Sequence, residues 1–536
     1  MSRHHQTPAF HMERLNQHIY SRGFFLVDSE HHMELDKFPH LSDWNITKKA
    51  GLTFYVHPEQ HLQLHEMDSQ LFILLGHAYN PFTMEHREQQ LLERLATTHT
   101  ANRQSFHESL NQLTGSFLFA RAMDVSKPTR EIELIGDTAG MLQVAYGIVA
   151  GHVCISSHTQ LIGDVFNLKA SDYINRLIHY RFYHLLGKSL PGDLTPYEGI
   201  KRLIPNHTAT IRRSTTDHMR FYPSRADVSR LAQDKRNYEQ KVEACSSILA
   251  NSLHLITRKW SAPAISLTGG CDSKTTLACA KDYDHLFKYF SYNSSAEEAV
   301  DAQAASHICS ALGLRHKIDV IPEEDQSTDD IRVTRAIIEM NCGNIGKCNH
   351  NDARKRAYYA KHADFDVEVK SWVSEVARAY YSKRFLKRSF PKTPTPRLLT
   401  SLYKFFLFDR QLVSQTNAVF QRYIDEYMAL PHGTPFDWQD MFFWEFRMSS
   451  WNGLTITGEH QYAYEVTIPY NNRMLLELML SIPLEYRIRD QMHKDIRAHM
   501  NPFIDKTGVS VVNVKHTRTR ALLERLYLEI HSRVPF

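Results

Sequence analysis

The chain lacks the features that identify several large classes of protein. No uncharged apolar stretch approaches the ~20 residues that a membrane-spanning helix needs, and the first residues show neither an apolar core nor a small-residue cleavage site. The net charge is only +4 over 536 residues, which gives no support for a nucleic-acid or membrane-surface partner. We therefore expect a globular protein that binds neither nucleic acid nor membrane.

Cysteine is scarce and irregularly placed. The seven cysteines lie between residues 154 and 348, and an odd number without a tight framework indicates reduced thiols and a cytoplasmic location. Cys342, Cys348 and His350 lie close together in the sequence. Because that group lacks a Cys-x-x-Cys step and a fourth ligand, we do not expect a zinc site there.

The length and the order of apolar segments predict two domains. A chain of 536 residues is too long for a single core. Short apolar runs divided by turn residues predict a strand-rich domain over residues 1–222. Over residues 223–536 strands alternate with helices, which predicts a doubly wound parallel sheet, and apolar-periodic segments beyond about 395 predict an added helical layer. The fold class predicted is α/β.

The strongest candidate site is the stretch TGGCDSK at residues 268–274. An apolar run before it predicts a buried strand, and the residues after it predict a helix, so the stretch lies at the carboxyl end of a parallel strand, where such sheets bind ligands. Glycines, hydroxyl donors, a helix N-terminus and a lysine together suit a phosphate group. The candidate residues are Thr268, Gly269, Gly270, Asp272, Ser273 and Lys274.

Asp272 is the unusual member, because a carboxylate repels phosphate unless a cation such as Mg²⁺ lies between them. Two commoner phosphate motifs do not match: Lys274 follows Ser273 rather than a glycine, and Gly-x-Gly-x-x-Gly does not occur in the loop. A glycine turn that leads into a helix cap and binds nothing is the alternative at this point.

The loop resembles the Ser-Gly-Gly-x-Asp-Ser pyrophosphate loop of the ATP pyrophosphatase superfamily, with Thr268 in place of the first serine. Over most of the chain the order of segments resembles one branch of it, the asparagine synthetase and β-lactam synthetase family. The resemblance implies an αββα glutamine-amidotransferase-like sandwich over residues 1–222. It implies an ATP pyrophosphatase domain over residues 223–536, with ATP and Mg²⁺ as cofactors.

Further site residues follow from the same resemblance. Ser291 falls where the family contacts adenosine, and Glu375 falls on the family's second magnesium carboxylate, beside Asp272. Lys494 falls on the family's catalytic lysine, which supports the charged transition state. A surface lysine on a helix is the alternative for Lys494.

The sequence also departs from the family. Residue 2 is Ser2 and no cysteine precedes Cys154, so the N-terminal nucleophile of a glutamine amidotransferase is missing and we expect no glutamine hydrolysis. Trp372 stands where the family has Glu or Tyr, and Thr467 where it has Arg. Trp372 either packs against the substrate or belongs to the core.

These observations predict an ATP-dependent, AMP-forming synthetase that adenylates a carboxylate and lets an amine displace AMP. The amine is intramolecular, part of a peptide or a separate molecule, and Glu445 and Glu465 are weak candidates for its base. The partners expected are small-molecule or peptide carboxylates and amines, and a homodimer is left open. The alternatives are a non-catalytic scaffold, ammonia-dependent amidation of a small acid, and an RNA-modifying member of the superfamily, which the near-neutral charge disfavours.

Overall fold

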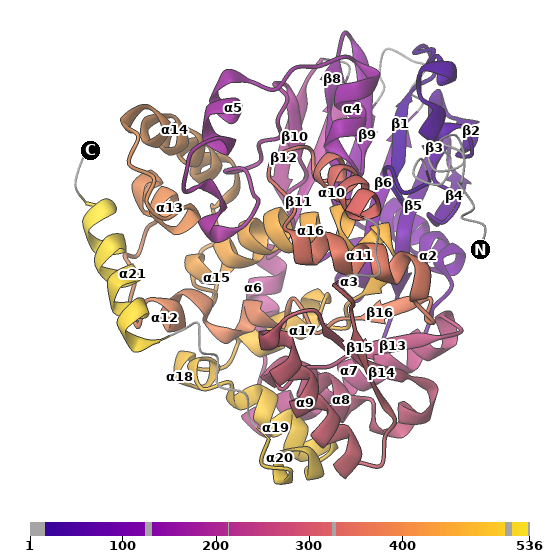
Figure 1. The fold of residues 1–536 in the computed structure, drawn as a ribbon. Helices are drawn as coiled ribbons and strands as arrows, with labels where there is room; N and C mark the ends of the chain where they lie inside the picture. The colour runs from indigo at the N-terminus through magenta and orange to yellow at the C-terminus, as the bar shows by residue number, and fades with distance from the viewer. Residues whose placement is uncertain (1–16, 124–130, 213, 324–327, 510–516, 534–536) are drawn as a thin grey trace.

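The computed structural model describes residues 17–123, 131–212, 214–323, 328–509 and 517–533. Three β-sheets and the helices around them form its scaffold (Figure 1). No helix in these ranges has both the length and the apolar character needed to cross a membrane.

The N-terminal part forms two antiparallel sheets of six strands each. In spatial order the first consists of β10 (Ile200–Arg202), β8 (Ala145–Val149), β9 (His152–Ser156), β1 (Phe24–Asp28), β3 (Leu52–Val56) and β2 (Asn45–Lys49). The second consists of β12 (Thr216–Arg220), β11 (His207–Arg212), β7 (Glu131–Gly136), β6 (Thr114–Met123), β5 (Gln70–Tyr79) and β4 (Leu62–Met67). Their facing sides share one apolar core.

Strand β5 shows how the layers are built. Alternate side chains of a strand point to opposite faces, and Ile73 and Leu75 belong to the core between the sheets. Phe72 and Leu74 instead pack with α2 (Glu88–Ala101) and α3 (Arg103–Asn111). On the outer face of the first sheet lies α4 (Thr159–Val165), whose leucine and isoleucine pack against β1 and β3. This is the αββα arrangement that the sequence predicts.

The third sheet has five parallel strands in the order β15-β14-β13-β16-β17. The strands are β13 (Pro263–Ser266), β14 (Lys288–Asn293), β15 (His316–Val320), β16 (Val367–Val369) and β17 (Glu465–Thr467). The order reverses at β13, so right-handed crossovers on its two sides place helices on opposite faces of the sheet. The predicted doubly wound α/β fold is therefore confirmed.

Helices account for most of the remaining described chain. They are α5 (Asp172–Ile178), α6 (Arg225–Ala232), α7 (Tyr238–Lys259), α8 (Cys271–Cys279), α9 (Ala296–Ala311), α10 (Thr328–Asn341), α11 (His350–His362), α12 (Tyr380–Arg384), α13 (Pro396–Tyr403), α14 (Arg410–Tyr427), α15 (Trp438–Phe442), α16 (Leu454–Gly458), α17 (Arg473–Leu480), α18 (Leu484–Ile488), α19 (Gln491–Met500), α20 (Phe503–Lys506) and α21 (Arg518–His531). Those from α13 onward include the helical layer expected beyond residue 395.

A long bent helix joins the parallel sheet region to the sandwich. A π-helical segment, η6 (Phe443–Gly453), connects α15 directly to α16. Trp444 in this segment donates its indole N–H to the carbonyl of Thr138 (2.7 Å), and Gln143 donates to the carbonyl of Ser449 (2.8 Å). The segment thus packs on the loop that follows β7.

Candidate functional site

The carboxyl ends of β13 and β16 bring two of the predicted segments together. The strands are neighbours, with Ile265 opposite Val369. The loop at 267–270 follows β13, and the segment 370–373, with the short helix η5 (Ser374–Arg378) after it, follows β16. The hydroxyls of Thr276 in α8 and Ser371 lie 2.7 Å apart. The point where the strand order reverses is the place where such sheets bind ligands.

Hydrogen bonds hold the glycine loop in a defined shape. Ser273 Oγ donates to the carbonyl of Thr268 (3.0 Å), and the N–H of Gly270 donates to Thr268 Oγ1 (3.1 Å). The N–H of Gly269 donates to Asp301 Oδ1 in α9 (3.2 Å). A carboxylate therefore already contacts one of the loop amides, and a phosphate at that amide would compete with Asp301.

Ser291 and Lys274 lie at the edges of this loop. Ser291 is buried in β14, where its Oγ donates to the carbonyl of Leu267 (2.6 Å). This bond fixes the end of β13. Lys274 Nζ donates to the carbonyl of Val509 (3.1 Å), and burial lowers the pKa of Lys274. The predicted contacts of both residues with a nucleotide stay predictions.

Asp272 lies between two basic side chains that sequence reasoning missed. Arg378 Nη1 donates to Asp272 Oδ2 (2.5 Å), and Arg378 Nε also donates to Asp490 (2.8 Å). His493 Nε2 lies 3.4 Å from Asp272 Oδ1. Oδ1 is buried and has no hydrogen-bond partner among the described residues. The spacing of residues in the sequence could not show that Arg378 and His493 would lie beside Asp272.

Glu375 lies close enough to Asp272 for the two charges to interact. Burial raises the pKa of Glu375, and the negative charge of Asp272 raises it further. Among the described residues, Asp272 lies with Cys271 and His493 in a group whose possible ligand atoms are all within 4.8 Å of one another. Carboxylate oxygens suit a hard cation such as Mg²⁺, and the pair of ligands expected from the sequence, Asp272 and Glu375, stays a prediction.

Two cavities meet at Glu375. The central cavity, of about 610 Å³, includes Tyr292, Lys370, Trp372 and His460 among its lining residues. Trp372 packs on the core and lies edge-on to His460, with ring centroids 5.4 Å apart, so it is both core and cavity wall.

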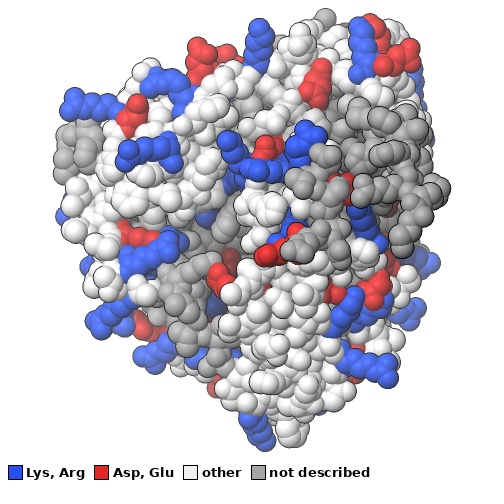
Figure 2. Space-filling view, viewed as in Figure 1, with Lys and Arg blue, Asp and Glu red and all other residues white. Residues whose placement is uncertain are grey.

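The basic cavity, of about 510 Å³, also has Glu375 in its lining. Four cationic side chains line it: Arg378, Lys383, Arg384 and Arg518. Such a lining favours an anionic ligand. On the face drawn in Figure 2, Lys and Arg are interspersed with Asp and Glu rather than gathered into one large patch.

Lys494 is exposed on α19. Two neighbours on the same helix contact the loop region instead: His493, described above, and Arg497, whose Nη1 donates to Thr275 Oγ1 (3.2 Å). The catalytic role of Lys494 stays a prediction.

Thr467, which departs from the family, and Glu445 and Glu465, the two candidate bases, all contact residues of the sandwich. Thr467 is buried, and its Oγ1 lies 3.1 Å from His77 Nε2. Glu445 is buried and accepts from Arg220 (2.5 Å). Glu465 pairs with His77 Nδ1 (2.8 Å); although burial acts in the opposite direction, that charge lowers the pKa of Glu465 to about 2. Both glutamates are thus engaged in ion pairs.

Lys370 is the cavity residue that sequence reasoning missed. It follows β16 directly and is buried, and its Nζ donates to Glu368 Oε1 and to the hydroxyl of Tyr292, both at 2.8 Å. Burial lowers the pKa of Lys370 to about 8. The only feature of the sequence that could have indicated this residue is its position directly after the short segment Val367–Val369.

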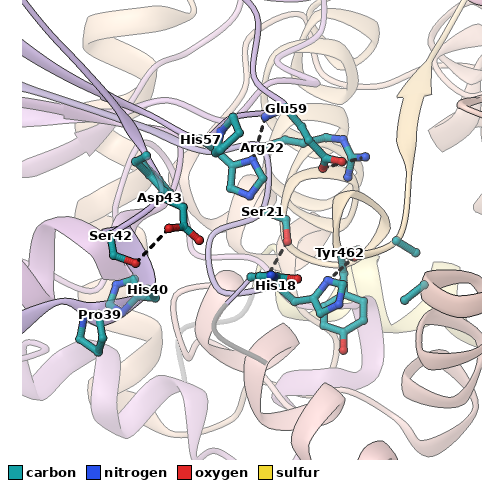
Figure 3. A pocket seen from close by; sticks show the side chains of 15 residues that line it. His18, Ser21, Arg22, Pro39, His40, Ser42, Asp43, His57, Glu59 and Tyr462 are labelled. Atoms are coloured by element: carbon teal, nitrogen blue, oxygen red, sulfur yellow. Dashed lines mark hydrogen bonds and ion pairs between the residues drawn. The ribbon is translucent and has the colours of Figure 1, made fainter. Parts of the chain in front are cut away.

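A further cavity, of about 450 Å³, lies where β1 begins and β3 ends. Figure 3 shows His57, Arg22 and Glu59 together on its wall, where Arg22 Nη2 and Glu59 Oε2 are 3.1 Å apart. Ser21, drawn below them, donates its hydroxyl to the carbonyl of His18 (2.9 Å). None of the described residues that line this cavity is a cysteine.

Comparison with known proteins gives limited information. No family model and no curated protein matches the chain. Among solved structures, glutamine phosphoribosylpyrophosphate amidotransferase from B. subtilis, complexed with ADP and GMP, is 11% identical over 69% of this chain and 73% of that chain, with a TM-score of 0.22. A structure of the allosteric regulatory enzyme of purine biosynthesis is 12% identical over 59% of this chain and 63% of that chain, with a TM-score of 0.24.

The chain thus spans less than two thirds of the second of these structures. At these values the likeness carries no argument about activity. The resemblance to the asparagine synthetase family stays an expectation from the motifs.

Proposed function

We propose that the protein is an ATP-dependent synthetase that joins a carboxylate to an amine through an acyl-adenylate, releasing pyrophosphate and AMP. One observation carries the proposal. Asp272 and Glu375 follow neighbouring strands of the parallel sheet; Glu375 lines both the basic cavity and the central cavity, and Asp272 pairs with Arg378 of the basic cavity. A polyphosphate and an organic substrate could bind there on opposite sides of one carboxylate.

The positive charges near the loop indicate where the phosphates of ATP would bind. The loop at 268–274 offers hydroxyls and the N-terminus of α8, and Arg378 and Lys383 line the adjacent basic cavity. Held by Asp272 and Glu375, Mg²⁺ would reduce repulsion between the phosphates and these carboxylates. A carboxylate oxygen of the substrate attacks the α-phosphorus, the bond to the β-phosphate oxygen breaks, and pyrophosphate leaves with the electron pair. Cations around the pyrophosphate stabilise that leaving group.

A non-catalytic scaffold protein is the second candidate function, and one observation favours it. Arg378 supplies a positive charge to Asp272 through a short ion pair, so the carboxylate is compensated without a metal. A protein that binds no nucleotide could keep this pair as a purely structural contact.

The test is direct. The purified protein is incubated with ATP, Mg²⁺ and pooled metabolites, and the products are identified by mass spectrometry. We expect AMP and pyrophosphate to accumulate together with a new amide. If no acid in the pool leads to AMP, the scaffold is favoured and the synthetase is excluded for those substrates; formation of ADP instead of AMP contradicts adenylation.

A further inference from the structure

Lys370 lies at the same edge of the sheet as the glycine loop. Its own N–H donates to the carbonyl of Thr467 (3.0 Å), so its backbone extends the sheet by one residue past β16. Its side chain lines the central cavity, on the side where Glu375 also lies. A group at this position faces whatever occupies the cavity next to the proposed adenylate.

The ammonium group is held in place but not fully enclosed by its partners. An ammonium has three N–H donors, and two are used by Glu368 Oε1 and the hydroxyl of Tyr292. Tyr292 in turn hydrogen-bonds Glu368. The Trp372 ring centroid lies 4.9 Å from Nζ, on the wall of the same cavity. The third N–H has no hydrogen-bond partner among the described residues, and Nζ lies beside the aromatic wall of the cavity.

Several elements contribute charged or titratable groups around Lys370, and the cavity wall also carries Lys188, Glu298, Lys347, Asp352, Glu375 and Glu459. Glu368 on β16 favours the ammonium form, and Tyr292 on β14 hydrogen-bonds it. Arg356 and Lys355 on α11 disfavour it, and His460 in η7 (His460–Tyr462) borders the same cavity. Burial has the largest effect and lowers the pKa of Lys370 to about 8. An amine of this pKa exchanges protons readily near neutral pH.

We propose that Lys370 accepts the proton of the amine that attacks the acyl-adenylate, and that the amine is an organic molecule bound in the central cavity. This inference rests on the synthetase function proposed above. Glu368 and Tyr292 are positioning residues, because they orient Nζ by accepting its hydrogen bonds. The volume of about 610 Å³ lies in the range of small-molecule sites and far exceeds what ammonia needs.

The step balances. The nitrogen lone pair of the amine forms the bond to the acyl carbon, and the bond from that carbon to the phosphate oxygen breaks, so AMP leaves with the electron pair. The proton lost by the amine nitrogen passes to the neutral Nζ of Lys370, which later releases it to solvent. No oxidant or further reactant is needed.

Two measurements on the whole protein test the inference. First, competitive labelling with acetic anhydride across pH reports the titration of individual lysines by mass spectrometry. We expect a midpoint near pH 8 for Lys370 and a midpoint about two units higher for exposed lysines such as Lys281. Glu368→Gln removes a charge that favours the ammonium, so it should move the Lys370 midpoint to lower pH. A Lys370 midpoint near 10 overturns the inference, whatever the activity.

Second, Lys370→Met is compared with the matched surface variant Lys281→Met, using ATP, Mg²⁺ and a mixture of the twenty amino acids, which carry both reacting groups. ATP–pyrophosphate exchange reports adenylation, and amide formation reports transfer. We expect Lys370→Met to keep exchange within about twofold and to lose amide formation by about 10²-fold or more. Hydroxylamine is a stronger nucleophile than an ordinary amine, and the cation formed by its attack is acidic enough to pass its proton to water, so it should restore acyl transfer.

The outcomes separate the two proposals. Normal amide formation by Lys370→Met overturns the role of Lys370 and leaves adenylation standing. Loss of both exchange and transfer in Lys370→Met, with normal circular dichroism, also overturns it, because a base for the amine is not needed to form the adenylate. Absence of exchange in the unmodified protein counts against the synthetase function, and the inference that rests on it then fails as well.

Discussion

At the scale of residues, the account depends on how Asp272 is balanced. Its carboxylate pairs with Arg378 on one oxygen and leaves the other oxygen buried near His493. Its charge also raises the pKa of Glu375. A side chain placed between a cation and a second carboxylate is suited to change partners when a metal and a polyphosphate arrive.

Asp272→Asn should abolish ATP–pyrophosphate exchange while the fold persists. Arg378 keeps its second partner, Asp490, so the substitution leaves no unpaired buried charge. Exchange is measured with labelled pyrophosphate, and thermal unfolding confirms the fold; Asp284→Asn, in the exposed helix η4 (Lys281–Leu286), is the control. Retained exchange would remove Asp272 from the metal site.

Lys494→Ala tests the lysine assigned by resemblance. We expect product formation to fall by about two orders of magnitude or more, with ATP binding nearly unchanged, because Lys494 is exposed on α19 and has no part in the loop's hydrogen bonds. Rates and ATP affinity are measured side by side with Lys506→Ala, another exposed lysine. An unchanged rate would end the assignment.

At the scale of elements, the sequence allowed prediction of structure formed by neighbouring residues, but not of contacts between segments that are far apart in the chain. The glycine loop could be predicted because the strand, the glycines and the helix start are adjacent in the chain. Strand β16 has only three residues and was not predicted as a strand, so the exact place of Lys370 at its end was missed. The apolar periodicity beyond about residue 395 predicted helices without their limits, whereas in the structure α13 ends at Tyr403 and Asp409 caps α14.

The π-helical segment gives an element-scale prediction. A Cβ on Gly453 would lie 2.1 Å from the carbonyl oxygen of Gly140, which belongs to the backbone of the sandwich. Gly453→Ala should therefore lower the free energy of unfolding by about 2–3 kcal/mol. Urea denaturation measures it, and Gly136→Ala, whose Cβ would meet only a leucine side chain at 3.4 Å, is the matched control. Equal stability of the two variants would contradict the packing described for η6.

At the scale of the whole molecule, the sandwich has the architecture expected of an amidotransferase-like domain but lacks a suitable thiol. The first cysteine in the sequence, Cys154, is buried in β9, and burial raises its pKa to about 12. Arg473, by contrast, ties the sandwich to α17 by donating to Asn206 and to the carbonyl of Gly136, both at 3.0 Å. These bonds hold α17 against the sandwich.

Glutamine hydrolysis should accordingly be absent. Purified protein incubated with amide-labelled glutamine, with and without ATP, should release no labelled ammonia above the background of a heat-denatured sample. The reason is chemical: a serine hydroxyl or a buried thiol is far less ionised near neutral pH than a catalytic thiol. Release of glutamate at a useful rate would show that another nucleophile has taken over.

The central claim is that the edge of the parallel sheet around Asp272 activates a carboxylate with ATP. ATP–pyrophosphate exchange tests it most directly, because exchange requires reversible adenylation and does not depend on knowing the amine. With Mg²⁺ and a panel of amino and organic acids, the account predicts exchange with at least one acid and its loss in Asp272→Asn. Exchange with none of the acids, or exchange that survives Asp272→Asn, would contradict the account.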